Sequence, residues 1–149
     1  METRVRIQSD SFDVGAEIAR ISTGAGAVAT FTGYVRDDDG LTALRLEHYP
    51  GMTEREIDRR IAEAATRWQL MAVTVIHRIG ELKPGDPIVL VAVASRHRRE
   101  AFAACEFLMD QLKTTVPFWK EQQKGTDHTW VEAKKSDDVA AERWLSPRR

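Results

Sequence analysis

The sequence has 149 residues, 42% hydrophobic and 30% charged, a composition typical of one globular domain and unlike that of a disordered chain. Its 22 Lys and Arg residues nearly balance 23 Asp and Glu residues, which argues against a general nucleic-acid or membrane-surface binder. One cysteine excludes a disulfide framework, a Cys-rich zinc site and a CxxC redox pair. Because there is no apolar leader and no run of about 18 apolar residues, we expect a cytoplasmic protein whose residues 1–149 form a single domain.

The first third of the chain predicts a strand, a helix and two further strands. Thr3–Gln8 alternates apolar and polar side chains, as a half-buried strand does. Asp13 is placed to cap a helix that ends before two closely spaced glycines. Ala27–Arg36 predicts a strand, and after an acidic turn at residues 37–40 we expect Leu41–Tyr49 to return as its hairpin-like partner.

The middle third predicts one helix and two strands. Thr53 is the expected N-cap of the helix, because acidic residues follow it in the first turn. Met71–Ile79 and Pro87–Ala94 predict strands, and the second is apolar on both faces, which favours a central place in a sheet. The helix is expected to bury Ile57, Ile61, Ala64 or Ala65, and Trp68.

The last third predicts a long helix at about His97–Thr114, a strand pair at Phe118–Lys124 and Thr129–Lys134, and a short helix near Asp137–Trp144. Strands and helices neither alternate strictly nor segregate, so we predict an α+β fold with a mostly antiparallel sheet and packed helices. The apolar stripe of the long helix is expected to contain Phe102, Cys105, Met109 and Leu112, with Leu108 beside it.

A basic segment precedes the long helix. If Ser95 caps this helix, three arginines and His97 crowd its first turn, where the helix dipole disfavours positive charge. Free backbone N–H groups at the same place would join His97 and Arg98 in an anion site. A solvated basic face, relieved by Glu100 and Glu106, explains the segment equally well, so both interpretations stay open.

Two lysines bracket an apolar turn just after this helix, in the segment from Lys113 to Lys120. The pKa of a lysine, near 10.4, is too high for a general base at neutral pH. Burial beside Phe118 and Trp119, or a nearby Arg98 or His97, would lower that pKa toward a useful range. The alternative is that Lys113 complements the helix C-terminus and Lys120 is an exposed strand residue.

Three other residues have a chemical and a structural interpretation. Arg36, at a strand end, is either a phosphate clamp or the partner of a neighbouring aspartate. His77, inside a predicted strand, fits a hydrogen-bonded structural histidine better than a catalytic one. Cys105, on the apolar stripe of the long helix, fits an inert core thiol better than a nucleophile.

The chain contains, in order, the segments FTGYVRD, LEHYPGM, VTVIHRIGELKPGD, SRHRREAF, LKTTVPFWK and WVEAKKSD. Together they resemble the large, catalytic subunit of molybdopterin synthase, from about Ala27 to Trp144. The resemblance implies an α+β fold with a hammerhead-like subdomain. It also implies a sulfurtransferase of molybdenum cofactor biosynthesis, which converts cyclic pyranopterin monophosphate into molybdopterin by installing two sulfurs as a dithiolene.

The same resemblance implies the residues of the site. Lys113 and Lys120 would be catalytic, and Arg36 would extend into the neighbouring subunit's site. The family often has an acidic residue where this chain has Gln122, so a contact that needs an acid is not expected there. The implied substrate-binding residues are Tyr34, Val35, Arg36, His97, Arg98, Glu121 and Gln122.

The implied partners are a small sulfur-carrier subunit, with a thiocarboxylate at its C-terminal glycine, and a second copy of this chain within a heterotetramer. Neither a metal, a bound cofactor, a nucleic acid nor a membrane is expected. The alternative function is a non-catalytic module that binds a small anion or a carrier protein. Conversion of the precursor by purified protein and thiocarboxylated carrier distinguishes the two.

Overall fold

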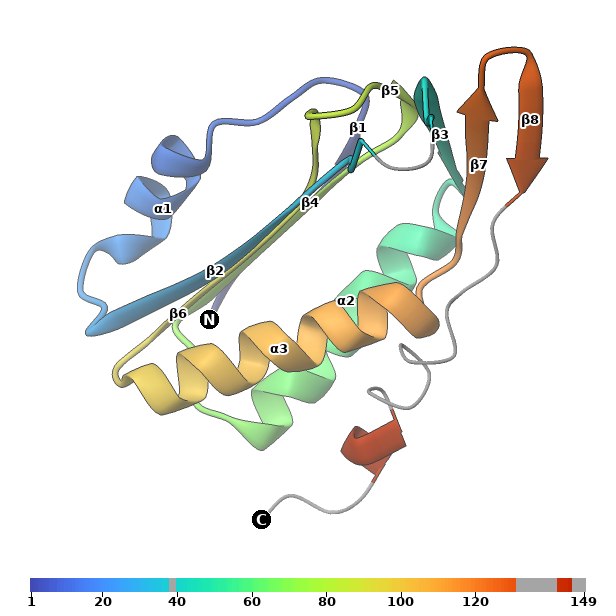
Figure 1. Ribbon diagram of the computed structural model, residues 1–149. Coiled ribbons are helices and arrows are strands. Elements are labelled where there is room, and N and C mark those ends of the chain that lie inside the picture. The colour runs from blue at the N-terminus through green and yellow to red at the C-terminus, as the bar shows by residue number, and fades with distance from the viewer. Residues whose placement is uncertain (38–39, 131–141, 146–149) are drawn as a thin grey trace.

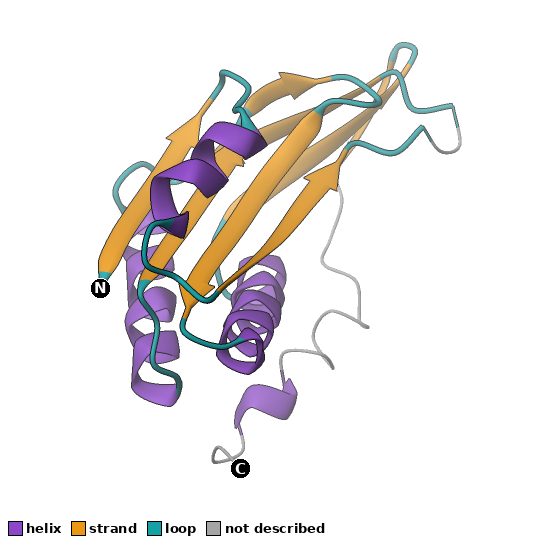
Figure 2. Cartoon of the chain, turned by 90° about the vertical axis from the view of Figure 1, so that its left-hand side faces the viewer, coloured by secondary structure: helices purple, strands orange, loops and turns teal. Residues whose placement is uncertain are grey.

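The computed structural model describes residues 1–37, 40–130 and 142–145, which contain three α-helices and two four-stranded β-sheets. The first sheet has α1 (Val14–Ser22) on one face and α2 (Met52–Arg67) and α3 (Arg98–Thr114) on the other (Figure 1). Figure 2 shows the same layers after a quarter turn. The predicted α+β class with mostly antiparallel pairing is confirmed.

The first sheet has the strand order β1-β4-β6-β2. Only β1 and β4 run parallel, and the other neighbours are antiparallel. β6 is central, as its apolar sequence predicts, and β2 is an edge strand. The four strands are β1 (Glu2–Gln8), β4 (Ala72–Arg78), β6 (Pro87–Ser95) and β2 (Ala27–Tyr34).

Alternate residues of this sheet build two cores, because successive side chains of a strand point to opposite faces. Val73 and Val75 of β4 pack into the larger core with α2 and α3. Ala72 packs on the other side with Ile21 of α1. His77 continues the spacing of Val73 and Val75, so it lies on the face that the two long helices cover.

The second sheet has the order β5-β3-β7-β8, entirely antiparallel. The predicted pairing of Leu41–Tyr49 with Ala27–Arg36 is wrong, because β3 pairs with β5 and β7 while β2 pairs with β6. The reason is a third core, in which buried Leu44 and Leu46 of β3 pack with Leu82. The strands are β5 (Gly80–Leu82), which the sequence analysis missed, β3 (Ala43–His48), β7 (Phe118–Lys124) and β8 (Asp127–Trp130).

The two shorter helices begin differently. Asp13 caps α1 as predicted, accepting a 3.0 Å hydrogen bond from the Ala16 N–H. The N-cap of α2 is Gly51, with φ of 83°, so the prediction of Thr53 is wrong. Thr53 is fully buried instead. Its hydroxyl keeps both hydrogen bonds in the interior, since it accepts one from the Tyr49 N–H (3.0 Å) and donates one to the Pro117 carbonyl (2.9 Å).

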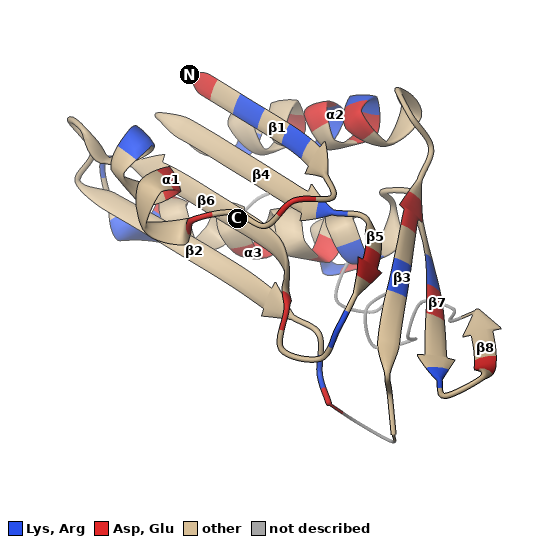
Figure 3. Ribbon diagram, turned by 90° about the horizontal axis from the view of Figure 1, so that it is seen from above, with Lys and Arg blue, Asp and Glu red and all other residues tan. Residues whose placement is uncertain are grey.

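The exposed side of α2 carries both charge signs along its length (Figure 3). Arg60 lies 2.9 Å from Glu56 and 3.0 Å from Glu63, and Arg67 lies 3.2 Å from Glu63. Such pairs three or four residues apart stabilise a helix by about 0.3–0.5 kcal/mol each.

The buried stripe of α3 differs from the predicted one at its aromatic residue. Cys105, Leu108 and Leu112 are buried as predicted, but Phe102 is 65% exposed, so its predicted place in the core is wrong. Phe107 is fully buried instead, with its ring centroid 5.6 Å from that of Trp68. The reason is that α3 packs against both the sheet and α2, so its buried surface extends toward the Phe107 side and leaves Phe102 outside.

The end of the chain is described in part. β7 matches its predicted range, and β8 includes Thr129 and Trp130 of the predicted final strand. Residues 131–134 of that strand, and residues 137–141 of the predicted last helix, lie outside the described residues. Arg143–Leu145 forms a 3₁₀ turn, and Trp144 packs edge-on against Phe107 at 5.3 Å between ring centroids.

Candidate active site

Two lysines and a histidine converge where the C-terminal end of α3 meets both sheets. Lys113 lies in the last turn of α3, Lys120 lies on β7, and His77 lies near the end of β4. The charges of both lysines, and that of His48 at the end of β3, act on His77. The structure therefore brings the two predicted catalytic lysines to one place, together with a histidine that the sequence analysis interpreted as structural.

His77 is held by two contacts. Its ring stacks on that of Phe118, with the centroids 3.9 Å apart, and its Nδ1 lies 2.8 Å from the Arg78 carbonyl oxygen. Burial is the main cause that lowers the pKa of His77 from 6.5 to about 4; the charges of Lys113 and Lys120 contribute to this shift, and the hydrogen bond to the carbonyl opposes it. The imidazole is therefore neutral at physiological pH.

Lys120 extends from the apolar face of the second sheet. Opposite residues of an antiparallel pair share a face, and Lys120 lies opposite Leu46, which is 3% exposed. Phe118, two residues earlier on β7, shares that face as well. Lys120 is therefore partly buried beside the third core, whereas Lys113 is exposed.

The two residues after Lys120 lie on opposite faces of the second sheet. Gln122 lies on the face of Lys120 and opposite Leu44. Glu121 lies on the other face, where its carboxylate contacts the ring of His128 at 2.8 Å and accepts a hydrogen bond from Gln123 (3.1 Å). These two hydrogen bonds lower the pKa of Glu121. The structure thus places Gln122, but not the Glu121 carboxylate, on the same face of the sheet as Lys120.

The segment Tyr34–Arg36 leaves the edge strand at the same end of the sheet, because Tyr34 lies opposite Pro87 at the start of β6. Tyr34 and Arg36 are exposed. Val35 is only 4% exposed and belongs to the third core, and its backbone is hydrogen-bonded to Asp86 (2.9 Å) and Gly85 (2.8 Å). Val35 therefore forms part of the wall under the site, and its two neighbours face solvent.

His97 and Arg98 lie at the opposite end of α3. Arg98 and Lys113 are the first residue and the next-to-last residue of the helix, so about 22 Å of helix axis separates them. The expectation that Arg98 or His97 lies beside Lys113 and lowers its pKa is therefore wrong within one chain. His97 contributes instead to a surface pocket of about 410 Å³, lined by Gln69, Arg96, His97 and Glu100.

Cys105 is buried against β6, with its Sγ 3.8 Å from the Val91 carbonyl oxygen. Burial raises the pKa of its thiol to about 11, so it is protonated at neutral pH and fits the predicted core thiol. Within residues 1–37, 40–130 and 142–145, no group of three His, Cys, Asp or Glu residues is placed to hold a metal ion. None of the helices in this described part is long and apolar enough to cross a membrane.

Sequence reasoning missed the structural role of Thr53, whereas it interpreted His77 as a hydrogen-bonded structural histidine, which its contacts with Arg78 and Phe118 fit. Thr53 anchors Pro117, and so fixes the start of β7 one residue before Phe118. No local signal marks it, since its partners lie on other segments. For His77 there was a signal: the alternation Val73, Val75, His77 places the histidine on the helix-covered face.

The chain is similar over nearly its whole length to proteins of one class. A family model described as the MoaE protein matches residues 7–115. A "Molybdopterin synthase catalytic subunit" of Mesorhizobium japonicum is 55% identical over 148 residues, covering 95% of this chain and 93% of the relative. A "Molybdopterin cofactor biosynthesis protein E" structure from Burkholderia multivorans has a TM-score of 0.84 and 48% identity, covering 98% of this chain and 99% of that one.

A more distant structure, a complex of subunits 1 and 2 of a molybdopterin-converting factor from Helicobacter pylori, shares the fold at 16% identity with a TM-score of 0.73, covering 89% of this chain and 91% of that one. The fold and the relatives define an α+β enzyme of molybdenum cofactor biosynthesis. The chain belongs to the MoaE family, the catalytic subunits of molybdopterin synthase.

Proposed function

We propose that this chain converts cyclic pyranopterin monophosphate into molybdopterin, taking two sulfurs from the thiocarboxylated C-terminus of a small carrier protein. The observation that carries the proposal is the convergence of Lys113 and Lys120 beside His77. Membership of a family of catalytic subunits supports an enzyme rather than the alternative of a non-catalytic binding module.

The chemistry requires cations near the transferred group. When the thiocarboxylate sulfur bonds to the substrate, a thioester forms, and its hydrolysis consumes one water for each sulfur and leaves the carrier's glycine as a carboxylate. An ammonium group stabilises the oxyanion that develops during this hydrolysis, and a lysine amine can also move protons during sulfur addition. Lys113 and Lys120 are the side chains for these two roles, in either order.

His97 and Arg98 fit the cyclic phosphate, because they combine positive charge with the free N–H groups of a helix N-terminus. The 22 Å of helix between Arg98 and Lys113 prevents one chain from placing both on a small substrate. We therefore propose that the lysines of one chain and the His97 and Arg98 of a second copy form each site. The resemblance also assigns Arg36 to the partner's site, although Arg36 follows β2 at the lysine end of its own chain.

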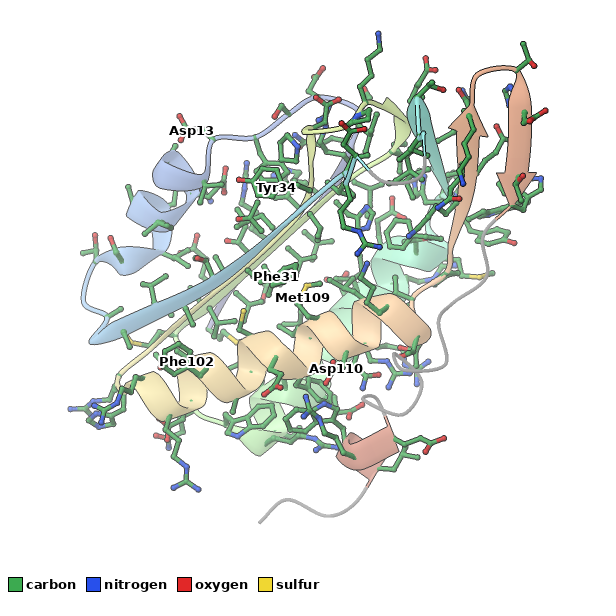
Figure 4. The ribbon with its side chains drawn as sticks, in the orientation of Figure 1. Asp13, Phe31, Tyr34, Phe102, Met109 and Asp110 are labelled. Carbon is green, nitrogen blue, oxygen red and sulfur yellow. The ribbon has the colours of Figure 1, made fainter. Side chains whose placement is uncertain are left out.

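The exposed edge of β2 is the surface we propose for this homodimer. Within the described residues β2 has a strand neighbour on one side only, and Phe31 on it and Phe102 on the adjoining α3 are 42% and 65% exposed. Figure 4 labels both, with Tyr34 and Met109, along the side where β2 and α3 meet. β2 spans about 26 Å and α3 about 25 Å, so the two elements have nearly the same length. If β2 of one copy pairs antiparallel with β2 of the other across a two-fold axis, the start of each α3 lies beside the end of the partner's α3.

The carrier subunit completes the proposed heterotetramer, with one carrier for each copy of this chain. The two-subunit complex from H. pylori, which shares this fold, supports such a partner. We propose the cytoplasm as the compartment, since the one cysteine is a buried, protonated thiol that forms no structural disulfide.

Subunit mixing tests the shared site. Lys113→Ala and Arg98→Ala homodimers should each lose nearly all conversion of the precursor by thiocarboxylated carrier. Refolding the two variants together in equal amounts makes half of the dimers mixed, and each mixed dimer has one intact site, so about a quarter of the wild-type activity should return. The measurement is molybdopterin formed per dimer.

A matched mixture uses Lys113→Ala with Arg36→Ala. Recovery in this mixture places Arg36 in the partner's site, as the resemblance implies, whereas no recovery places it in the site of its own Lys113. Mixed dimers that form and yet give no recovery with Arg98→Ala contradict the shared site. A wild-type protein that converts no precursor contradicts the proposed function itself.

A further inference from the structure

We propose that the pocket beside the start of α3 binds the pterin end of the precursor, and that Glu100 determines specificity there. Its carboxylate accepts two hydrogen bonds from the aminopyrimidinone edge of the pterin. The inference deepens the proposed function and rests on it, since the ligand is the cyclic pyranopterin monophosphate named there. It assigns a role to a carboxylate that the sulfur chemistry and the phosphate site leave unused.

The carboxylate of Glu100 has a buried oxygen without a partner. Its Oε2 is shut off from solvent, and no described residue donates a hydrogen bond to it. Arg96 and His97 precede it by four and three residues, yet in the part of the chain that the structure describes neither forms an ion pair with Glu100. A buried acceptor that is left unpaired costs free energy, so it requires an explanation, and a donor on a bound molecule supplies one.

Glu100 lies in the wall of a pocket of suitable size. It lines the pocket of about 410 Å³ together with Gln69, Arg96 and His97. Pockets for small molecules have volumes of about 300–1,000 Å³. A second hollow of about 430 Å³ adjoins this pocket, because Gln69 and Arg96 line both, and all the other residues that line it are apolar. A polar pocket with an apolar extension suits a flat ring system, which has polar edges and apolar faces.

A phosphate alone does not explain an acid in this pocket, because a carboxylate repels it. The aminopyrimidinone edge of a pterin presents two adjacent N–H donors, which match the two oxygens of a carboxylate as a guanidinium does. The last torsion of a glutamate is broad, so rotation about it turns both oxygens of Glu100 toward these donors. The pterin carbonyl beside them accepts a hydrogen bond from Gln69 or Arg96, which line the same pocket.

The placement of Glu100 relative to Arg98 fits the shape of the precursor. The two residues are two positions apart in α3, so they lie about 200° apart around the helix, and His97 precedes both as the N-cap. The precursor has its cyclic phosphate at one end and its aminopyrimidinone at the other. A molecule that lies across the start of α3 therefore has its phosphate on the Arg98 side and its pterin edge on the Glu100 side.

The test uses the sign of the effect of Glu100→Gln on binding of the precursor, measured by calorimetry without the carrier. This substitution keeps the shape of the side chain and removes a negative charge near the phosphate, so an acid that only complements the helix dipole predicts unchanged or tighter binding. We expect a Kd at least tenfold higher, with a similar rise in KM and kcat changed less than threefold. The matched control is Glu106→Gln on the same helix, a side chain 59% exposed, which should keep the wild-type Kd. Unchanged or tighter binding by Glu100→Gln overturns the proposal.

A second measurement does not depend on activity. Lumazine has a carbonyl group where pterin has the amino group, so the wild type should bind pterin at least tenfold more tightly than lumazine, and Glu100→Gln should bind the two within threefold of each other. Equal binding by the wild type overturns the proposal.

Cyclic GMP has the same edge and a cyclic phosphate, and tighter binding of cyclic GMP than of the precursor overturns the proposal in favour of a guanine nucleotide. A wild-type protein that selects pterin and converts no precursor contradicts the proposed function alone. One that converts the precursor without this selectivity contradicts the role of Glu100 alone.

Discussion

Thr53 joins three segments of the chain through one hydroxyl group. It accepts a hydrogen bond from Tyr49 at the end of β3 and donates one to Pro117 before β7, from within the first turn of α2. A buried hydroxyl with both hydrogen bonds satisfied contributes to stability, and it is costly to replace because the two backbone groups would lose their partner. Thr53 therefore helps to fix the start of the strand that carries Lys120, although it is far from both lysines in the sequence.

The burial of His77 makes stability depend on pH. Its pKa is about 4 in the folded protein against 6.5 as the ordinary value, so between these values the unfolded chain binds a proton that the folded chain does not. This contribution to stability is fully present above pH 6.5 and is lost as the pH falls toward and through 4. At about 1.4 kcal/mol for each pKa unit, it is on the order of 3 kcal/mol.

Urea unfolding at pH 7.5 and pH 4.5 checks this prediction. The difference in free energy of unfolding between the two pH values should be smaller in His77→Gln than in the wild type, because glutamine does not titrate. The same difference in both proteins would show that His77 is not buried in its neutral form.

At the scale of elements, the rotation of α3 about its axis decides which phenylalanine stabilises the fold. Phe107 is fully buried between Trp68 and Trp144, with the Arg67 guanidinium 4.9 Å from its ring centroid. Phe107→Ala should lower the free energy of unfolding by about 3–5 kcal/mol through the cavity it leaves. The measurement is chemical denaturation followed by tryptophan fluorescence and circular dichroism.

Phe102→Ala is the matched control on the same helix. The side chain is 65% exposed in one chain, so its loss leaves no cavity, and any destabilisation should depend on protein concentration through the proposed dimer. A larger, concentration-independent loss for Phe102→Ala than for Phe107→Ala would contradict the orientation of α3.

At the scale of the whole molecule, the edge of β2 is the surface where we propose that two copies of the chain meet. Phe31→Asp places a charge in the middle of the proposed interface, which should convert dimers to monomers while circular dichroism stays unchanged. Sedimentation velocity measures the oligomeric state. Met52→Asp, at a residue 53% exposed at the start of α2, is the control and should remain dimeric.

A Phe31→Asp protein that stays dimeric would place the interface elsewhere on the molecule. If the variant is monomeric and still converts the precursor at the wild-type rate, each chain holds a complete site. Monomers without activity agree with lysines and phosphate-binding residues contributed by different chains.

The sequence by itself determined most of the helices and strands, because their signals are local. Asp13 caps α1, the apolar run of β6 requires a central strand, and Lys113 and Lys120 stand out beside an apolar turn. Specific segments such as LEHYPGM and IHRIGEL were enough to predict the family to which the comparisons assign the chain. Information of this kind lies within a few neighbouring residues.

Only the tertiary structure decided how these parts meet. β3 pairs with β5 and β7 rather than with β2, because Leu44 and Leu46 are buried against Leu82 of β5, and the pairing residues of β7 lie 70 or more positions along the chain. For the same reason Thr53 is a buried residue that joins three segments rather than an N-cap, and His77 lies within reach of the charges of both lysines. The rigid length of α3 separates His97 and Arg98 from Lys113, although they stand in one continuous helix segment of the sequence. Long-range packing and the geometry of a helix are properties of the folded chain, and no local pattern contains them.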